Sequence, residues 1–233
     1  MRQVVLDTET TGLSAEDGHR IIEIGCVEVL NRRITGRSLH VYINPERDID
    51  QGALAVHGLT RERLESEPLF ADVADRFLGF VDGAQVLIHN APFDVGFLNA
   101  ELRRLGRGRF ESLCDEILDT LTLARELHPG KRNSLDALCD RYGISNAHRK
   151  LHGALLDAEL LADVYLAMTR GQDSLSILDG ERGQTRVVAF DEDGWPPEGL
   201  VVVHPDADEL AAHLELVENI AAEAGRPSLW GAD

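Results

Sequence analysis

Hydrophobic residues in the first half of the chain gather in short runs typical of β-strands. Residues 3–8, 20–30 and 38–43 are rich in valine, isoleucine and leucine, and residues 84–88 form a fourth apolar run. β-Branched residues favour strands. A short polar connection at residues 31–33 follows the second run. The second and third strands are therefore expected to pair as a hairpin.

After residue 70 the apolar residues recur at helical spacing. Residues 70–82 place Phe70, Val73, Phe77 and Val81 on one face, as an amphipathic helix requires. The same reasoning predicts helices over residues 93–105, 118–127, 134–142 and 153–168. Early strands followed by alternating strands and helices predict an α/β fold with a mixed sheet.

The chain is expected to have a compact domain followed by a linker and a tail. The predicted domain covers residues 1–171, and residues 172–207 begin as a polar stretch containing glycine, serine and aspartate, as a linker would. Residues 208–224 predict an amphipathic helix that ends at Gly225, within a tail of residues 208–233.

The composition and net charge of the chain argue against several classes of protein. The 233 residues carry a net charge of −18, which argues against a broad surface for duplex DNA, because such binding neutralises phosphates. A small pocket that holds a strand end remains compatible with this charge. No apolar stretch is long enough for a membrane span, and no signal peptide is apparent. The three cysteines are widely separated, which favours a reducing, cytoplasmic location.

Two carboxylates at the end of the first predicted strand suggest a metal site. Asp7 and Glu9 are two residues apart, so their side chains point to the same face of a strand. Two close anions raise each other's pKa, and a hard divalent cation such as Mg²⁺ relieves that repulsion. A surface hairpin can carry the same pair without a metal, but the apolar run before Asp7 favours a buried strand.

Two later segments add polar groups of the same chemistry. Asp94 lies in the first turn of a predicted helix, where a carboxylate also simply favours the helix dipole. Asp157 lies among alanine and leucine, an unusual place for a charge without a partner. His152 and Asp157 would point about 140° apart on one helix, so His152 is expected in a loop that ends at Gly153. A lone loop histidine is common, but these groups together match a two-metal phosphodiester site.

Three segments resemble the motifs of the DEDDh family of 3′→5′ exonucleases. They are residues 7–12, residues 90–94, and the pair His152 and Asp157. Residues 56–59, 129–139 and 151–158 are also similar to the proofreading subunits of bacterial DNA polymerase III. The resemblance covers residues 1–172 almost continuously and returns in the tail.

The resemblance implies a ribonuclease H-like fold, with a five-stranded mixed sheet flanked by helices. It also implies two Mg²⁺ or Mn²⁺ ions and assigns a role to each matching residue. Asp7, Glu9 and Asp157 would hold the first ion, Asp7 would bridge to the second, and Asp94 would support the second. His152 would be the general base. A pocket for the terminal nucleotide would include Asp7, Glu9, Thr10, Leu13, His57 and Asp157.

The resemblance also implies partners. A single-stranded or frayed DNA 3′ end would be the substrate. Gln172, Leu175 and Ile177 match a motif that binds the sliding clamp, and the helix of the tail with Leu229-Trp230 resembles a tether to the polymerase III alpha subunit. Family precedent suggests a small theta-like accessory subunit. Two alternatives stay open, namely an exonuclease of the same family that trims RNA and a non-catalytic tether between polymerase and clamp.

Overall fold

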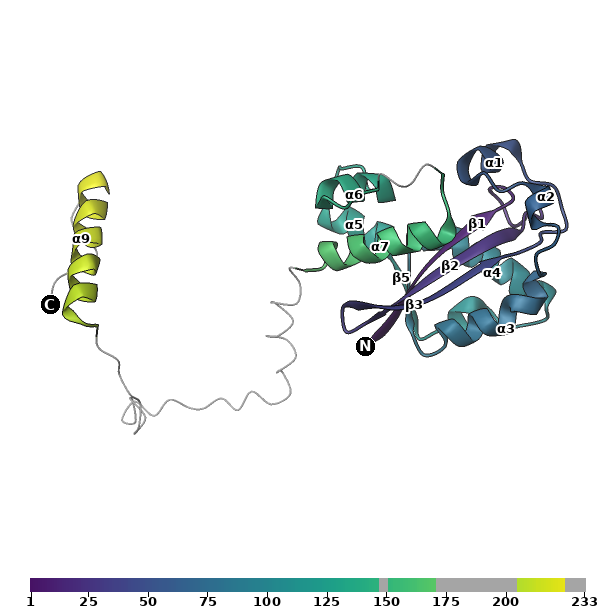
Figure 1. The fold of residues 1–233 in the computed structure, drawn as a ribbon, viewed down its shortest axis with the longest axis horizontal. Coiled ribbons are helices and arrows are strands. Elements are labelled where there is room, and N and C mark those ends of the chain that lie inside the picture. Colours follow the sequence, from purple (N-terminus) through teal and green to yellow (C-terminus); the bar gives the residue numbers. More distant parts are fainter. Residues whose placement is uncertain (147–150, 171–204, 225–233) are drawn as a thin grey trace, which may run out of the picture. The chain divides into compact units, whose positions relative to one another are not determined.

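The computed structural model describes residues 1–146, 151–170 and 205–224. The chain divides into two compact units, Met1–Gly180 and Glu181–Asp233. The first unit contains a sheet with helices against both faces, and the second contains one described helix (Figure 1).

The sheet has five strands in the order β3-β2-β1-β4-β5. The strands are β1 (Arg2–Thr10), β2 (Ile21–Leu30), β3 (Arg33–Tyr42), β4 (Gln85–Ile88) and β5 (Glu116–Asp119). β1 pairs antiparallel with β2, and β2 pairs antiparallel with β3. On its other edge β1 pairs parallel with β4, which in turn pairs parallel with β5. The predicted mixed sheet and its hairpin are confirmed.

Helices connect the strands and continue after them. Within the first unit they are α1 (Gln51–His57), α2 (Arg61–Leu64), α3 (Phe70–Val81), α4 (Ala91–Arg104), the 3₁₀ helix η1 (Phe110–Ser112), α5 (Thr120–Leu127), α6 (Leu135–Tyr142) and α7 (Ala154–Met168). The second unit contributes α9 (Ala207–Ala224).

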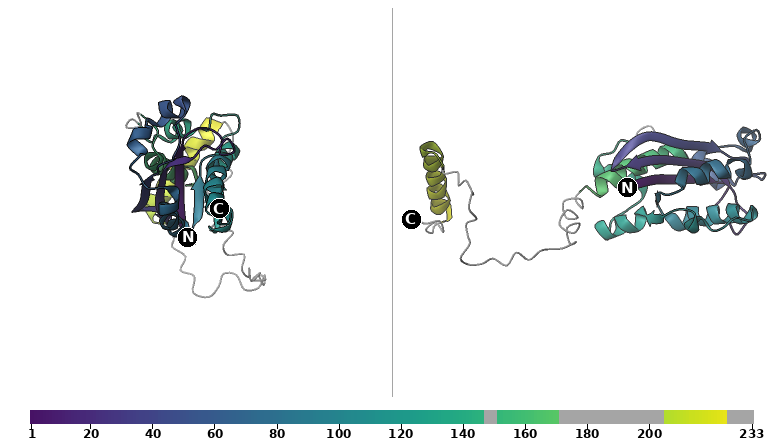
Figure 2. Two further views of the ribbon diagram at one scale, coloured as in Figure 1. Left: turned by 90° about the vertical axis from the view of Figure 1, so that its right-hand side faces the viewer. Right: turned by 90° about the horizontal axis from the view of Figure 1, so that it is seen from below.

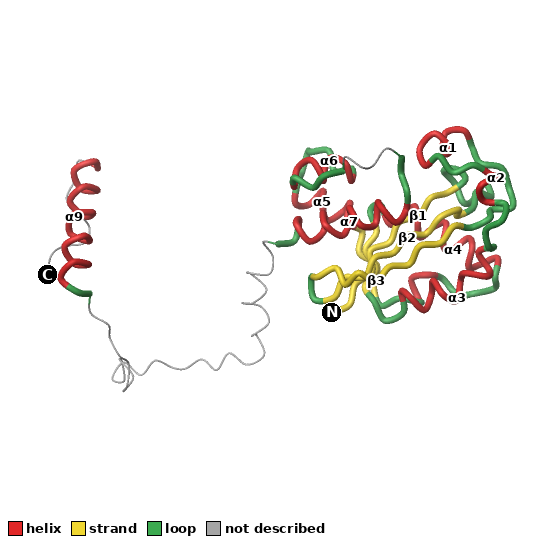
Figure 3. Tube along the Cα trace, in the orientation of Figure 1, coloured by secondary structure: helices red, strands yellow, loops and turns green. Residues whose placement is uncertain are grey.

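Helices cover both faces of the sheet (Figure 3), and the buried side chains form one core cluster on each face. On one face, Val4 and Leu6 of β1 pack with the buried residues of α3 and α4. On the other face, Val5 packs with α5, α6 and α7. The right-hand view of Figure 2 shows β1–β3, in purple and blue, beside the blue-green helices of the first layer. Successive residues of β1 therefore pack against different sets of helices, because successive side chains of a strand point to opposite faces of the sheet.

Several predicted boundaries were wrong because pairing across the sheet decided them. Residues 118 and 119 belong to β5, which pairs with β4, and not to a helix over 118–127. Asp119 ends β5 and caps α5, where its Oδ1 accepts a hydrogen bond from the Leu121 N–H at 3.0 Å. β3 begins at Arg33 rather than residue 38 because its first residues pair with the end of β2. The short helices α1 and α2 were missed.

Several predictions fall partly on residues outside the described ranges. The proposed clamp motif (Gln172, Leu175 and Ile177), most of the predicted linker, and Leu229-Trp230 lie there. The helix predicted over 208–224 is confirmed as α9. Across residues 1–146, 151–170 and 205–224, no helix combines the length and apolar character needed to cross a lipid bilayer.

Candidate active site

All five residues predicted to carry the chemistry line one cavity of about 270 Å³. They are Asp7, Glu9, Asp94, His152 and Asp157. We call this space the carboxylate cavity. It lies where β1 and β4 end. Asp94 comes from the first turn of α4, Asp157 comes from the first turn of α7, and His152 precedes α7. Asp136, in the first turn of α6, also lines the cavity. Segments far apart in the sequence are thus brought together by the parallel pairing of β1 with β4.

Asp7 and Glu9 occupy the face of β1 that packs against α7. Val5, two residues before Asp7, belongs to the core beneath α5, α6 and α7, and strand alternation puts Asp7 and Glu9 on the same side. In the antiparallel pair, Asp7 lies opposite Gly25, and Glu9 lies opposite Glu23. The prediction that the two carboxylates share a face is confirmed.

Gly25 permits the close approach of α7 to the sheet. A Cβ atom at this position would lie 2.2 Å from the carbonyl carbon of Ala154 and 2.3 Å from the amide nitrogen of Leu155. Real Cβ atoms essentially never come that close, so the backbone of α7 rests where a side chain would otherwise be. Since Gly25 is opposite Asp7, this contact sets the distance between the β1 carboxylates and the first turn of α7.

The first turn of α7 completes a group of three possible metal ligands. Glu9, His152 and Asp157 each offer a ligand atom, and these atoms lie within 4.8 Å of one another. Gly153 is the N-cap of α7, so His152 precedes the helix, as the sequence predicted. Its Nδ1 is 3.2 Å from Oδ2 of Asp157, and 44% of its side chain is exposed. The main-chain N–H of His152 donates to the Val56 carbonyl at 3.1 Å, which ties this loop to α1.

Asp94 approaches the cavity from the other layer of the fold. It is in the first turn of α4 and only 4% exposed. Thr8 lies between Asp7 and Glu9 and faces this layer, and its hydroxyl donates to Oδ1 of Asp94 at 2.7 Å. Burial raises the pKa of Asp94 to about 7, against the opposing effect of the Thr8 hydrogen bond. Burial thus outweighs the hydrogen bonds that favour the Asp94 anion, whereas a nearby cation would favour that anion.

A second cavity of about 390 Å³ adjoins the first and includes the residues predicted for a terminal nucleotide. Glu9, Thr10, Leu13 and His57 line it, whereas Asp7 and Asp157 line only the carboxylate cavity. We call it the His57 cavity. Nδ1 of His57 accepts the Leu59 N–H at 3.0 Å, so Nε2 carries the ring proton. This Nε2 is buried, and burial lowers the His57 pKa against the opposing effect of a hydrogen bond with the Thr10 backbone.

Sequence reasoning missed Glu23, which lies beside the site. Glu23 is opposite Glu9 and only 3% exposed. Its Oε1 is 2.7 Å from Nε2 of His40, and its Oε2 has no partner among the described residues. The only available signal was an acidic residue inside the apolar run over 20–30. Its relation to Glu9 required the register of the two strands, which the sequence pattern alone does not set.

The donor set fits a divalent metal ion. The carboxylate cavity offers oxygen atoms and one imidazole, the ligands of hard or borderline cations. Several anions lie together there, with Glu9 and Asp157 both largely buried. Buried charges in proteins are paired or coordinate metals. The arrangement can therefore hold a cation and present it to a substrate oxygen in the adjoining cavities.

Comparison with known proteins gives consistent results. A family model described as Exonuclease matches residues 4–165. The chain is 49% identical over 238 residues to the DNA polymerase III subunit epsilon of Pasteurella multocida (strain Pm70), covering 98% of this chain and 93% of that protein. It is 48% identical over 242 residues to the subunit of the same name from Escherichia coli (strain K12), covering 99% and 98%.

Solved structures with a similar fold are also exonucleases. Exonuclease X in complex with 5′ overhanging duplex DNA aligns with a TM-score of 0.55 at 25% identity, over 73% of this chain and 93% of that one. E. coli Exonuclease I in complex with a dT13 oligonucleotide aligns with a TM-score of 0.66 at 18% identity, over 76% of this chain and 43% of that one. The second likeness concerns the fold alone.

Proposed function

Because the chain belongs to the exonuclease family, together with the DNA polymerase III epsilon subunits, we propose that it is the 3′→5′ exonuclease that proofreads DNA synthesis. The observation that carries this proposal is the convergence of Asp7, Glu9, Asp94, His152 and Asp157 on one cavity. These side chains come from three separate segments, and an ordinary surface would not gather so many carboxylates.

Asp7, Glu9 and Asp157 would hold a divalent ion, and Asp94 would support a second one beside Asp7. All four line the carboxylate cavity, and their oxygen donors suit Mg²⁺ or Mn²⁺. Two such ions, when bound, lower the pKa of a water molecule and stabilise the attacking and leaving oxygens of a phosphodiester. Thr8 would orient Asp94 through the hydrogen bond that its hydroxyl already donates.

His152 would act as the general base. With its Nδ1–H directed at Asp157, Nε2 is the ring nitrogen that accepts a proton. As the water oxygen bonds to the terminal phosphorus, the bond from phosphorus to the 3′ oxygen breaks. His152 takes the proton of the water, and a nucleoside 5′-monophosphate leaves. The 3′ oxygen of the shortened strand leaves as an alkoxide and takes a proton from solvent water, which gives the new 3′-hydroxyl group.

The His57 cavity would receive the terminal nucleotide. His57 lines it together with Thr10 and Leu13, so the imidazole ring would contact the nucleotide. Leu13 lines this cavity and is 86% exposed, which leaves it available for contact with a base. Gly52 also lines the cavity, and it offers no side chain to the nucleotide.

DNA is the expected substrate, and RNA trimming is the alternative within the same family. Side-by-side assays with DNA and RNA oligomers of one sequence should give a higher kcat/KM for DNA. A 3′-terminal mismatch in duplex DNA should be removed faster than a matched end, because a frayed end reaches the cavity more readily. Faster hydrolysis of the RNA oligomer would contradict proofreading and favour RNA trimming.

The tail would connect the nuclease to the replication machinery. We place the contact with the polymerase III alpha subunit at residues 208–233 and the sliding-clamp contact at Gln172, Leu175 and Ile177. α9 supports the first assignment because Leu210, Leu214 and Ile220 are exposed on it, and an amphipathic helix can lie in a partner's groove. We also propose that a theta-like subunit binds the nuclease domain. The proposed location is the cytoplasm. Cys26 and Cys114 are free thiols, as a reducing compartment favours.

Deletion of residues 208–233 should abolish co-purification with the replicative polymerase subunit while leaving hydrolysis of a short DNA strand unchanged. The reason is that α9 lies in a separate compact unit from the carboxylate cavity. The measurement is capture of the polymerase by the tagged full chain and by the shortened one. Equal capture by both would refute the tether. Capture without any hydrolysis by the full chain would instead favour a non-catalytic tether.

A further inference from the structure

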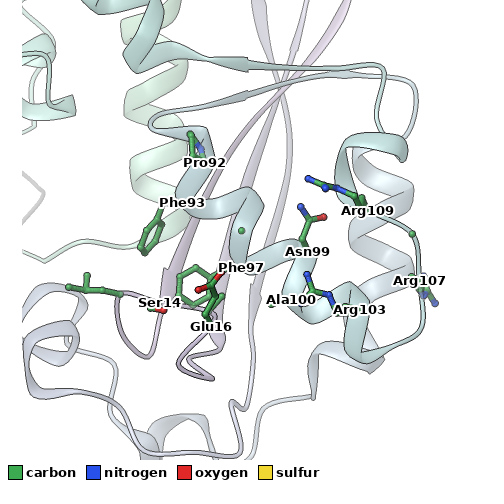
Figure 4. A pocket seen from close by; sticks show the side chains of 14 residues that line it. Ser14, Glu16, Pro92, Phe93, Phe97, Asn99, Ala100, Arg103, Arg107 and Arg109 are labelled. Carbon is green, nitrogen blue, oxygen red and sulfur yellow. The ribbon is translucent and has the colours of Figure 1, made fainter.

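A third cavity of about 460 Å³ runs along α4 beside the proposed active site. Phe93 and Glu16 lie on one side of it, and Arg103, Arg107 and Arg109 lie on the other (Figure 4). We call it the arginine groove. Three arginines around one depression are notable in a chain whose net charge is −18.

The arginine groove is continuous with the two cavities already described. Phe93 lines all three cavities, and Leu13 lines both the arginine groove and the His57 cavity. A polymer whose end lies in the carboxylate cavity could therefore enter the groove by passing Phe93. The Phe93 ring is only partly buried, and aromatic faces of this kind stack on nucleic acid bases.

The charges of the groove are available to an anion. Arg107 contacts Asp75 at 2.6 Å, and Arg109 contacts Glu111 at 2.5 Å. Both pairs are solvent-exposed on at least one side, and such pairs are weak. Arg103 forms no ion pair with any carboxylate of the described residues. Glu16 is the one acidic residue lining the groove within the described part of the chain.

We propose that the arginine groove holds the phosphates of the DNA strand upstream of its 3′ end, an inference that rests on the proposed exonuclease function. Asp94 and Arg103 are nine residues apart on α4, which corresponds to about 13 Å at the rise of an α-helix. At about 3.4 Å or more per nucleotide, Arg103 meets a phosphate roughly two to four nucleotides from the scissile bond. A strand longer than this gains a charge contact that a dinucleotide lacks.

The test compares Arg103→Ala with Arg104→Ala. The two arginines are neighbours on α4, but Arg104 lines a different cavity, together with Glu101 and Glu46. Both are exposed, so neither truncation should unfold the protein. For a single-stranded 12-mer, Arg103→Ala should raise KM about 3- to 10-fold with kcat unchanged. The dinucleotide kinetics should stay as in the unchanged protein. The slope of log KM against the logarithm of the salt concentration should decrease by about 0.7, the value for one lost phosphate contact to a single strand.

Binding measured in EDTA separates this inference from the proposed function. The fluorescence anisotropy of a labelled 12-mer should show weaker binding by Arg103→Ala and unchanged binding by Arg104→Ala, whether or not hydrolysis occurs. If the unchanged protein hydrolyses DNA and Arg103→Ala binds the 12-mer equally well, the proposed role of the arginine groove is wrong. The proposed exonuclease function would then still stand. Equal effects of the two substitutions, or displacement of the 12-mer by an acidic peptide at equal concentration, would also overturn the proposed role of the groove.

Discussion

Replacing Asp157 with asparagine is expected to lower kcat/KM for single-stranded DNA by about 10³-fold or more, equivalent to about 4 kcal/mol of transition-state stabilisation. Asp157 contributes a ligand atom to the group formed with Glu9 and His152, and it contacts the proposed base directly. Asparagine keeps the shape of the side chain but removes its charge. The measurement is steady-state release of mononucleotides with Mg²⁺ at saturating concentration.

The matched control is Asp163→Asn. Asp163 is in the same helix, α7, but it is exposed to solvent. This variant should retain full activity. Without metal, Asp157→Asn should unfold at the same temperature as the unchanged protein or higher, because it relieves repulsion among close anions. Full activity of Asp157→Asn, or an equal loss of kcat/KM in both variants, would show that Asp157 is not part of the active site.

Replacing Gly25 with alanine is expected to lower the free energy of unfolding by about 1–3 kcal/mol, the range for overpacking a tight contact. The new Cβ would overlap the backbone at Ala154 and Leu155, so α7 must shift away from β1. Displacement of a reacting group by about 1 Å can reduce activity by about 10²-fold. The expected result is a folded protein with a lower kcat, measured by denaturant unfolding and by kinetics.

Gly79→Ala is the control for this prediction. Gly79 is exposed within α3, and a Cβ there meets no atom within 4 Å among the described residues. Alanine should stabilise this helix by about 0.5–1 kcal/mol and leave the kinetics unchanged. If Gly25→Ala were as active and as stable as Gly79→Ala, the close packing of α7 on β2 would not determine the geometry of the site.

The local chemistry of the site was predictable because it depends on simple periodicities. The spacing of Asp7 and Glu9 on a strand predicted their common face, and the angle between His152 and Asp157 predicted that the histidine precedes the helix. The structure confirms both. The family resemblance supplied the roles of these residues and the count of five strands, which the hydrophobic pattern alone did not give.

Features that depend on register and close packing were not predictable. Glu23 becomes part of the surroundings of Glu9 only through the pairing of β1 with β2. β5 is four residues long and is defined by its pairing with β4, so its last two residues, 118 and 119, resembled the start of the following helix. The importance of Gly25 follows from the backbone of α7, more than 120 residues later in the chain. None of these relations produces a periodic pattern of residues in the sequence.

The central claim is that the carboxylate cavity removes nucleotides from a DNA 3′ end with the aid of divalent ions. The most direct measurement follows a 5′-labelled single-stranded oligomer incubated with the full chain in Mg²⁺, in Mn²⁺ and in excess EDTA. The account predicts a ladder that shortens one nucleotide at a time from the 3′ end with either metal and no cleavage in EDTA. Absence of cleavage with both metals, undiminished cleavage in EDTA, or release of the labelled 5′ nucleotide at the outset would contradict it.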